Sequence, residues 1–154
     1  MVKPAHTNVL FLCTGNSCRS IFAEAILNAR AGGRFRAFSA GSRPAGSIHP
    51  LALELLERRG HPVAELRSKS WEEFATPQAP VMDLVITVCD RARGEACPIW
   101  PGSPATLHWS FPDPAAFQGS RPQAQAFFAQ VYGEIERAIT ALIEGRAAED
   151  RSPT

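Results

Sequence analysis

The sequence predicts an α/β fold built on a parallel sheet, because short apolar runs alternate along the chain with longer helix-like segments. Four of these runs have the length of strands, so a four-stranded sheet is expected. The chain has 154 residues, which suits one domain. We expect that domain to span residues 1–145 and to be followed by a polar tail over residues 146–154.

The first half of the chain is predicted to hold two strand–helix pairs. Residues 9–12 are all apolar and are followed by turn residues, which is typical of a buried strand. Residues 21–30 have helical periodicity and end before two consecutive glycines. Residues 36–40 form a second short strand, and a leucine-rich helix is expected over residues 49–60.

The second half repeats the alternation with longer connections. Residues 71–74 are expected to form one helical turn, and residues 84–88 a strand buried on both faces, because they are largely β-branched. Residues 105–110 form a weaker strand. Residues 123–144 carry an apolar stripe at helical spacing and predict a long helix. The Pro- and Gly-containing segment 97–104 is too long for a tight turn and is expected to be a functional loop.

Composition excludes several classes of function. The net charge is only +1, which gives no support for binding to nucleic acid or to an acidic membrane surface, so any anion site must be local. The sequence has no apolar stretch of membrane-spanning length and no signal-peptide core. We therefore expect a cytoplasmic protein.

The most informative segment is residues 13–20, CTGNSCRS, which lies between the first predicted strand and the first predicted helix. The N–H groups and dipole at the start of a helix bind tetrahedral oxyanions and favour a thiolate, so Cys13 is the predicted nucleophile. Arg19 has the planar fork that grips two oxygens of an anion, and Ser20 can donate a hydrogen bond to the sulfur. We expect these groups to lower the pKa of Cys13. Gly15 is the residue best suited to a positive φ, and Asn16 the next best. The predicted substrate-binding residues are Thr14, Gly15, Asn16, Ser17, Cys18, Arg19 and Ser20.

Simpler interpretations of the cysteines in this segment remain open. Cys13 can be a buried structural cysteine at the end of a strand, since free cysteines are often buried. Cys18 has no obvious redox partner within the segment, and a packing role is favoured for it over a catalytic one.

These residues resemble a known family. The pattern Cys-x5-Arg-Ser directly after an N-terminal strand resembles the low-molecular-weight protein tyrosine phosphatases. The fuller string CTGNSCRS, with Ala-Glu at 23–24 and Ser-Ala-Gly at 39–41, is more similar to the arsenate reductases built on that phosphatase fold. The resemblance extends from about residue 8 to the last helix, and it implies a three-layer α/β/α architecture.

A second pair of cysteines bears on the reaction. Cys89 follows the strand predicted over 84–88, and Cys97 lies beyond it. Functional groups gather at the carboxyl ends of parallel strands, so Cys13 and Cys89 can approach one another. Reduction of arsenate consumes two electrons, which two thiols release when they form a disulfide. Two alternatives stay open: zinc ligands, although Cys-x2–4-Cys spacing is lacking, and unrelated buried thiols.

The resemblance implies an order of steps for these cysteines. Cys13 attacks arsenate, Cys89 attacks Cys13 and releases arsenite, and Cys97 then moves the disulfide away from Cys13. A thioredoxin-type or glutaredoxin-type protein reduces that disulfide. A disulfide requires Cα atoms within about 7 Å, so we expect oxidation to reorganise residues 90–100.

Asp113 is the predicted general acid. It stands between Pro112 and Pro114, which restrict the backbone and allow the carboxylate to be aimed. In the resembling families an Asp-Pro loop donates the proton to the leaving oxygen. The simpler alternative is an exposed turn aspartate. Ala115 follows where the phosphatases usually carry a tyrosine, which disfavours the competing prediction of a phosphatase that hydrolyses phosphotyrosine or small phosphoesters.

No resident cofactor or metal is expected. The histidines are scattered without metal-ligand spacing. Some of the resembling arsenate reductases bind potassium beside the loop at residues 13–20, and Asn16, Glu24 and Ser39 match ligands of that site. Ser70 stands where the acidic ligand is expected, so the resemblance leaves potassium binding at these residues open. We expect a monomer. A non-enzymatic oxyanion-binding or redox-sensing protein is a third possible function, since it would use the same loop without turnover.

Overall fold

In the computed structural model of the protein, the residues described are 6–89 and 100–146. Its sheet has four parallel strands in the order β2-β1-β3-β4. The strands are β1 (Thr7–Cys13), β2 (Phe35–Gly41), β3 (Leu84–Thr87) and β4 (Ala105–His108). The predicted α/β fold with a four-stranded parallel sheet is confirmed. The strands β3 and β4 end at Thr87 and His108, before the predicted ends at residues 88 and 110.

The α-helices are α1 (Arg19–Arg30), α2 (Pro50–Arg58) and α4 (Arg121–Ile143), with short 3₁₀ helices η1 (Trp71–Phe74) and η2 (Pro114–Ala116). Among the α-helices, α2 and α4 begin at residues whose side chains cap them. The long helix α4 starts before the predicted position, because Ser120 and Gln123 form a capping box there. His49 caps α2, whose first residue is a proline.

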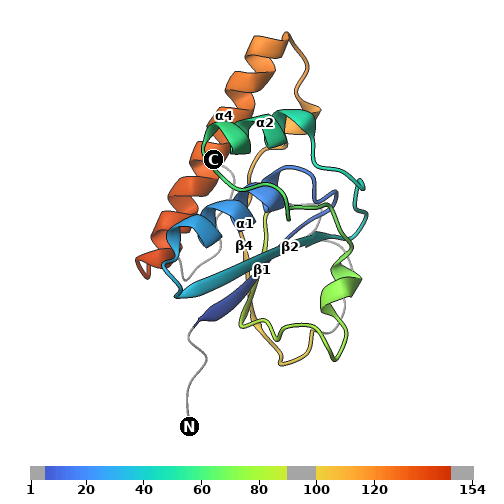
Figure 1. The fold of residues 1–154 in the computed structure, drawn as a ribbon, viewed down its shortest axis with the longest axis vertical. Coiled ribbons are helices and arrows are strands. Elements are labelled where there is room, and N and C mark those ends of the chain that lie inside the picture. The colour runs from blue at the N-terminus through green and yellow to red at the C-terminus, as the bar shows by residue number, and fades with distance from the viewer. Residues whose placement is uncertain (1–5, 90–99, 147–154) are drawn as a thin grey trace.

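Figure 1 shows α1, α2 and α4 on one side of the sheet, and an apolar core lies on each of its two faces, in agreement with the three-layer architecture. Alternate residues of a strand face opposite sides, and β1 is buried on both. Val9 and Phe11 belong to the larger core beneath α1, α2 and α4. Leu10 and Leu12 face the other way, into a smaller core with Phe74 of η1. The four apolar residues predicted as a buried strand are thus divided between two cores.

The parallel arrangement gathers the loops that follow the strands at one edge of the sheet. Cys13 is the last residue of β1, and the pairing of Leu12 with Thr87 brings the end of β3 beside it. Residues 109–113 follow β4 as a loop at the same edge. Cys97, most of the segment 90–100 expected to reorganise, and the tail beyond residue 146 lie outside the described residues.

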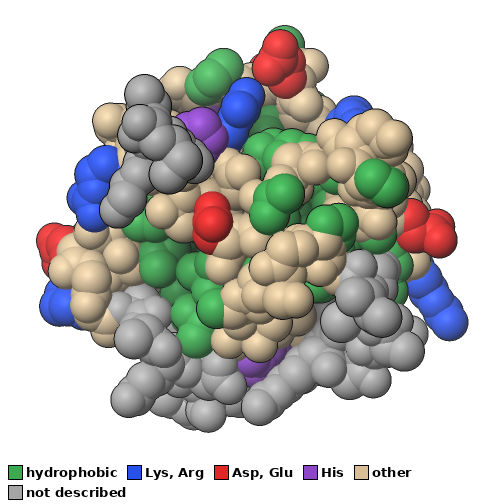
Figure 2. All heavy atoms as spheres, turned by 90° about the horizontal axis from the view of Figure 1, so that it is seen from below, with side chains coloured by type: hydrophobic (Ala, Val, Ile, Leu, Met, Phe, Trp, Pro, Cys, Tyr) green, Lys and Arg blue, Asp and Glu red, His purple; other side chains and the backbone are tan. Residues whose placement is uncertain are grey.

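The surface carries no concentrated charge on the face that Figure 2 shows, where basic and acidic side chains are interspersed. This pattern matches the net charge of +1. Within residues 6–89 and 100–146, no helix combines the length and the apolar character that crossing a membrane requires.

Candidate active site

The loop between β1 and α1 leaves its N–H groups available for an anion. Helix α1 begins after Cys18, and no side chain caps its first N–H groups. Asn16 takes the left-handed backbone conformation with φ 46°. The sequence favours Gly15 for that conformation, but Asn16 adopts it because its buried side chain is held by hydrogen bonds on several sides.

A pocket of about 250 Å³ opens over this loop. The residues that line it are Cys13, Thr14, Gly15, Ser17, Cys18, Arg19, Asp113 and Ala115. The fold therefore brings Asp113 to the loop from a distant part of the sequence, as predicted. Asn16 and Ser20, which the sequence places among the substrate-binding residues, are fully buried behind the pocket and support it from within.

Arg19 and Asp113 lie together at the pocket. Nη1 of Arg19 donates a hydrogen bond of 3.0 Å to the carbonyl oxygen of Phe111, which orients the guanidinium. Its Nη2 lies 3.7 Å from Oδ2 of Asp113. The other carboxylate oxygen accepts the N–H of Ala115 at 3.0 Å, and the Asp113 side chain is 44% exposed. Asp113 is thus held at the mouth of the pocket, where it can exchange protons with water and with a leaving group.

The Cys13 sulfur is buried and held by polar contacts with Ser20 and Asn16. Its Sγ lies 2.9 Å from Oγ of Ser20 and accepts the backbone N–H of Asn16 at 3.2 Å. Burial raises the pKa of Cys13, and the hydrogen bond from Ser20 and the charge of Arg19 act in the opposite direction. The prediction of a lowered pKa is therefore wrong in its net direction, because Cys13 is only 4% exposed and burial outweighs these contacts.

Cys18 differs from Cys13 in its surroundings. Burial is the main effect that raises its pKa, to about 12, and the negative charge of Asp113 adds to the rise. Its nearest polar contact is the hydroxyl of Ser17, at 3.7 Å. A thiol with this pKa stays protonated at neutral pH, which favours the packing role over a nucleophilic one.

Cys89 lies close to the pocket at the end of the neighbouring strand. Its sulfur is buried and 3.8 Å from Oγ1 of Thr14, a residue of the loop. The strand register continues from Leu12 and Thr87, so Cys89 is one residue past the position opposite Cys13. The electrostatic effect of Cys89 on the pKa of Cys13 reflects the same proximity. The predicted approach of these two cysteines is therefore present in the fold.

A chain of buried polar side chains lies behind the loop. The Asn16 amide nitrogen donates to Oγ of Ser20 at 2.8 Å and to Oγ of Ser39 at 3.0 Å. The Ser39 hydroxyl donates to Oε1 of Glu24 at 2.5 Å. Because both N–H groups of Asn16 are used in this way, the Ser20 hydroxyl is left to donate its proton to Cys13.

Several residues that support the loop were not predicted. Ser68 donates to the carbonyl oxygen of Gly15 at 3.2 Å, and the backbone N–H of Lys69 donates to Oδ1 of Asn16 at 2.9 Å. Gly41 lies so close to the loop that a Cβ there would stand 2.9 Å from the carbonyl oxygen of Cys13. Ser68 and Lys69 carry no local sequence signal, because each contact joins distant segments. Gly41 belongs to the Ser-Ala-Gly string at 39–41, but that string does not reveal its contact with the loop. In the parts of the chain that the structure describes, no three His, Cys, Asp or Glu side chains gather as metal ligands do.

Comparison with known proteins agrees with this geometry. The family model of the low molecular weight phosphotyrosine protein phosphatases matches residues 8–152. An arsenate reductase of Halalkalibacterium halodurans is 34% identical over 136 residues, which cover 88% of this chain and 94% of the relative.

Two solved structures extend the comparison. The arsenate reductase of Archaeoglobus fulgidus has 29% identity and a TM-score of 0.69, with 88% of this chain and 98% of that chain covered. The thioredoxin-dependent arsenate reductase of Corynebacterium glutamicum has 30% identity and a TM-score of 0.63, with 93% and 64% covered. The chain therefore belongs to the low molecular weight phosphotyrosine protein phosphatase family, and within that family it is related to the arsenate reductases.

Proposed function

We propose that the protein reduces arsenate to arsenite through a relay of three cysteines, Cys13, Cys89 and Cys97. The observation that carries the proposal is the position of Cys13 and Cys89 at the ends of adjacent strands, beside a pocket suited to an oxyanion. A phosphatase needs only the first of these thiols. The arsenate reductases among the relatives support the same activity.

The first step forms a bond between sulfur and arsenic. The N–H groups at the start of α1 and the guanidinium of Arg19 hold the arsenate oxygens. The Cys13 thiolate attacks arsenic, and a hydroxyl group of the arsenate leaves as water after it receives a proton from Asp113. The product is a thiol–arsenate adduct in which arsenic is still in the +5 state.

The second step transfers the electrons. The Cys89 thiolate attacks the Cys13 sulfur, the sulfur–arsenic bond breaks, and its electron pair stays with arsenic, which leaves as arsenite. A Cys13–Cys89 disulfide remains. Adjacent parallel strands lie about 4.8 Å apart, so residues at neighbouring strand ends meet the requirement of about 7 Å between Cα atoms.

The third step restores Cys13. The thiolate of Cys97 attacks Cys89, which frees the Cys13 thiolate and leaves a Cys89–Cys97 disulfide. An external dithiol then supplies two electrons and two protons to reduce that disulfide. The thioredoxin dependence of the relative from Corynebacterium glutamicum supports thioredoxin as this reductant. A glutaredoxin-type reductant is the alternative that the same assay distinguishes.

The order of the relay is tested with two single variants in the presence of thioredoxin and its reductase. Cys89→Ser is expected to release no arsenite, because nothing displaces arsenic from Cys13. Cys97→Ser is expected to release one equivalent per protein and then stop with a Cys13–Cys89 disulfide, which mass spectrometry detects. Both variants should still hydrolyse p-nitrophenyl phosphate, which requires only the pocket. Sustained reduction of arsenate by either variant would exclude the relay.

Hydrolysis of small phosphoesters is a second activity that the site supports. The family model and the grouping of Cys13, Arg19 and Asp113 favour it. Ala115 lines the pocket and offers no aromatic wall for a phosphotyrosine ring. We therefore expect hydrolysis of p-nitrophenyl phosphate to be slow beside arsenate reduction, and replacement of Ala115 by Tyr to favour aromatic phosphoesters.

A further inference from the structure

Lys69 contacts two points of the buried polar chain behind Cys13. Its backbone N–H donates to Oδ1 of Asn16 at 2.9 Å. This contact fixes the orientation of the amide, so that its nitrogen faces Ser20 and Ser39. The Lys69 ammonium lies 3.9 Å from Oε1 of Glu24, the oxygen that accepts the Ser39 hydroxyl. The Lys69 side chain is buried, with 8% exposed, and the Glu24 side chain is partly buried, with 14% exposed. The sequence has only two lysines, and the rest of its basic residues are arginines.

The hydrogen bonds between this ion pair and the nucleophile have one consistent direction. Ser39 donates to Glu24, and Asn16 donates to both Ser39 and Ser20. The Ser20 proton is therefore directed to the Cys13 sulfur, where it stabilises a thiolate. Ser39 donates in this direction because an ionised carboxylate accepts hydrogen bonds and does not donate them.

We propose that Lys69 is a positioning residue for Cys13: its buried ammonium balances the charge of Glu24, which keeps the chain of hydrogen bonds directed toward the sulfur without placing a net negative charge behind it. The proposal rests on Cys13 being the nucleophile of the proposed function. No contact between Lys69 and the substrate is required.

The charge balance matters because the Glu24 carboxylate and the Cys13 thiolate are two negative charges close to the same loop. The other charged side chains near the pair are Arg67 and Glu73, which bind one another, and Glu65, which lines a pocket together with Glu24; all three are largely exposed. Solvent screens them, so Lys69 is the principal counter-charge of Glu24. An uncompensated negative charge on Glu24 would also oppose binding of an arsenate dianion.

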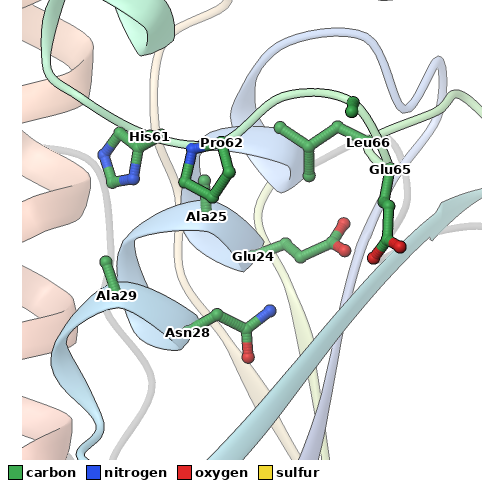
Figure 3. Close-up of a pocket in the computed structure, with 9 residues that line it drawn as sticks. Glu24, Ala25, Asn28, Ala29, His61, Pro62, Glu65 and Leu66 are labelled. Carbon is green, nitrogen blue, oxygen red and sulfur yellow. The ribbon is translucent and has the colours of Figure 1, made fainter.

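Burial raises the pKa of Glu24, and the charge of Lys69 acts against that rise. Glu24 also lines a second pocket, of about 440 Å³. Figure 3 shows its side chain extending from α1 into this pocket, toward the segment that carries Pro62, Glu65 and Leu66. Water in that pocket can reach the carboxylate. Replacement of Lys69 is therefore expected to expose the sulfur to an unbalanced charge.

The test measures the rate at which iodoacetamide alkylates Cys13 as a function of pH, resolved by fragment mass spectrometry. Alkylation requires the thiolate, so the rate reports its population. An unbalanced unit charge within about 10 Å at an effective dielectric constant near 20 shifts a pKa by about one unit. Lys69→Met should therefore lower the rate at neutral pH about tenfold. Glu24→Gln should change it in the opposite direction, and the double variant should return it to within about twofold of the original rate.

Arg67→Met is the matched control, because it removes the same charge from the same segment at an exposed position. It is expected to leave the rate nearly unchanged. A structural role alone would lower the melting temperature without opposite signs for the two single variants. The proposal is overturned if Lys69→Met leaves the profile unchanged or if the double variant is no closer to the original than Lys69→Met. If Lys69→Met does not fold, the Glu24→Gln variant still tests the sign. Alkylation needs no arsenate, so its outcome is independent of whether the relay operates.

Discussion

Replacement of Ser20 by alanine should impair the nucleophile more than any other change outside the pocket lining. The Ser20 hydroxyl is fully buried and lies 2.9 Å from the Cys13 sulfur. Because Asn16 already donates to its oxygen, the serine has its proton available for Cys13. In Ser20→Ala the sulfur loses this donor, and one N–H of the Asn16 amide loses its acceptor.

The size of the effect follows from the charge on the sulfur. A hydrogen bond to a charged group is worth about 1.5–3 kcal/mol, and one pKa unit corresponds to about 1.4 kcal/mol. The pKa of Cys13, already raised by burial, should therefore rise by a further one to two units or so. The thiolate population at neutral pH should fall about 10- to 100-fold. The stranded N–H of Asn16 should lower the free energy of unfolding by about 1–3 kcal/mol.

The assay compares the pH profile of Cys13 alkylation with the rate of a single turnover of arsenate. Both should fall by the same factor at neutral pH and should converge with the rates of the original protein at high pH. Ser47→Ala is the control, since that serine is exposed in the same part of the molecule. An unchanged alkylation profile in Ser20→Ala would refute the role assigned to the hydroxyl, and a loss confined to stability would assign Ser20 to packing alone.

Three further predictions concern the loop. Gly41→Ala should lower the melting temperature and weaken phosphate binding about tenfold or more, measured by calorimetry, because its Cβ would displace the loop at Cys13. Gly133→Ala in α4 meets no such contact and should do neither. Arg19→Lys should raise KM for arsenate about tenfold or more in steady-state assays, since an ammonium lacks the bidentate fork; an unchanged KM would contradict its role as an oxyanion ligand. The pKa of Cys18 is raised from 9.0 to about 12, so the stability linked to this thiol is present below pH 9 and is lost as the pH rises toward 12. Cys18→Ala should flatten the fall of the unfolding free energy in that window, measured with urea, and an equally steep fall would count against a buried neutral thiol.

Local patterns were enough to predict the order and type of the secondary structure elements. The alternation of strand-like and helix-like segments led to the four-stranded parallel sheet, and the apolar run at 9–12 led to β1. The ends of elements were less accurate. The apolar stripe placed the start of the long helix at residue 123, but α4 starts at Arg121. Its start is set by the capping box of Ser120 and Gln123, which the apolar stripe does not include.

The candidate site was also predicted only in part. The motif at 13–20 and the strand that precedes it were sufficient to predict a cysteine nucleophile, an oxyanion loop and the guanidinium that serves it, because all of these lie within one strand–helix connection. The approach of Cys89 followed from the general rule that parallel strands end at one edge of the sheet.

Tertiary structure decided the properties that depend on distant segments. Burial reversed the expected direction of the Cys13 pKa, since desolvation depends on everything packed around the sulfur. The support of Asn16 by Lys69 spans 53 positions of sequence and leaves no periodic or compositional trace. Residues adjacent in sequence can supply the hydrogen-bond donors of an anion site. The charge behind that site depends on which distant side chains the fold buries together.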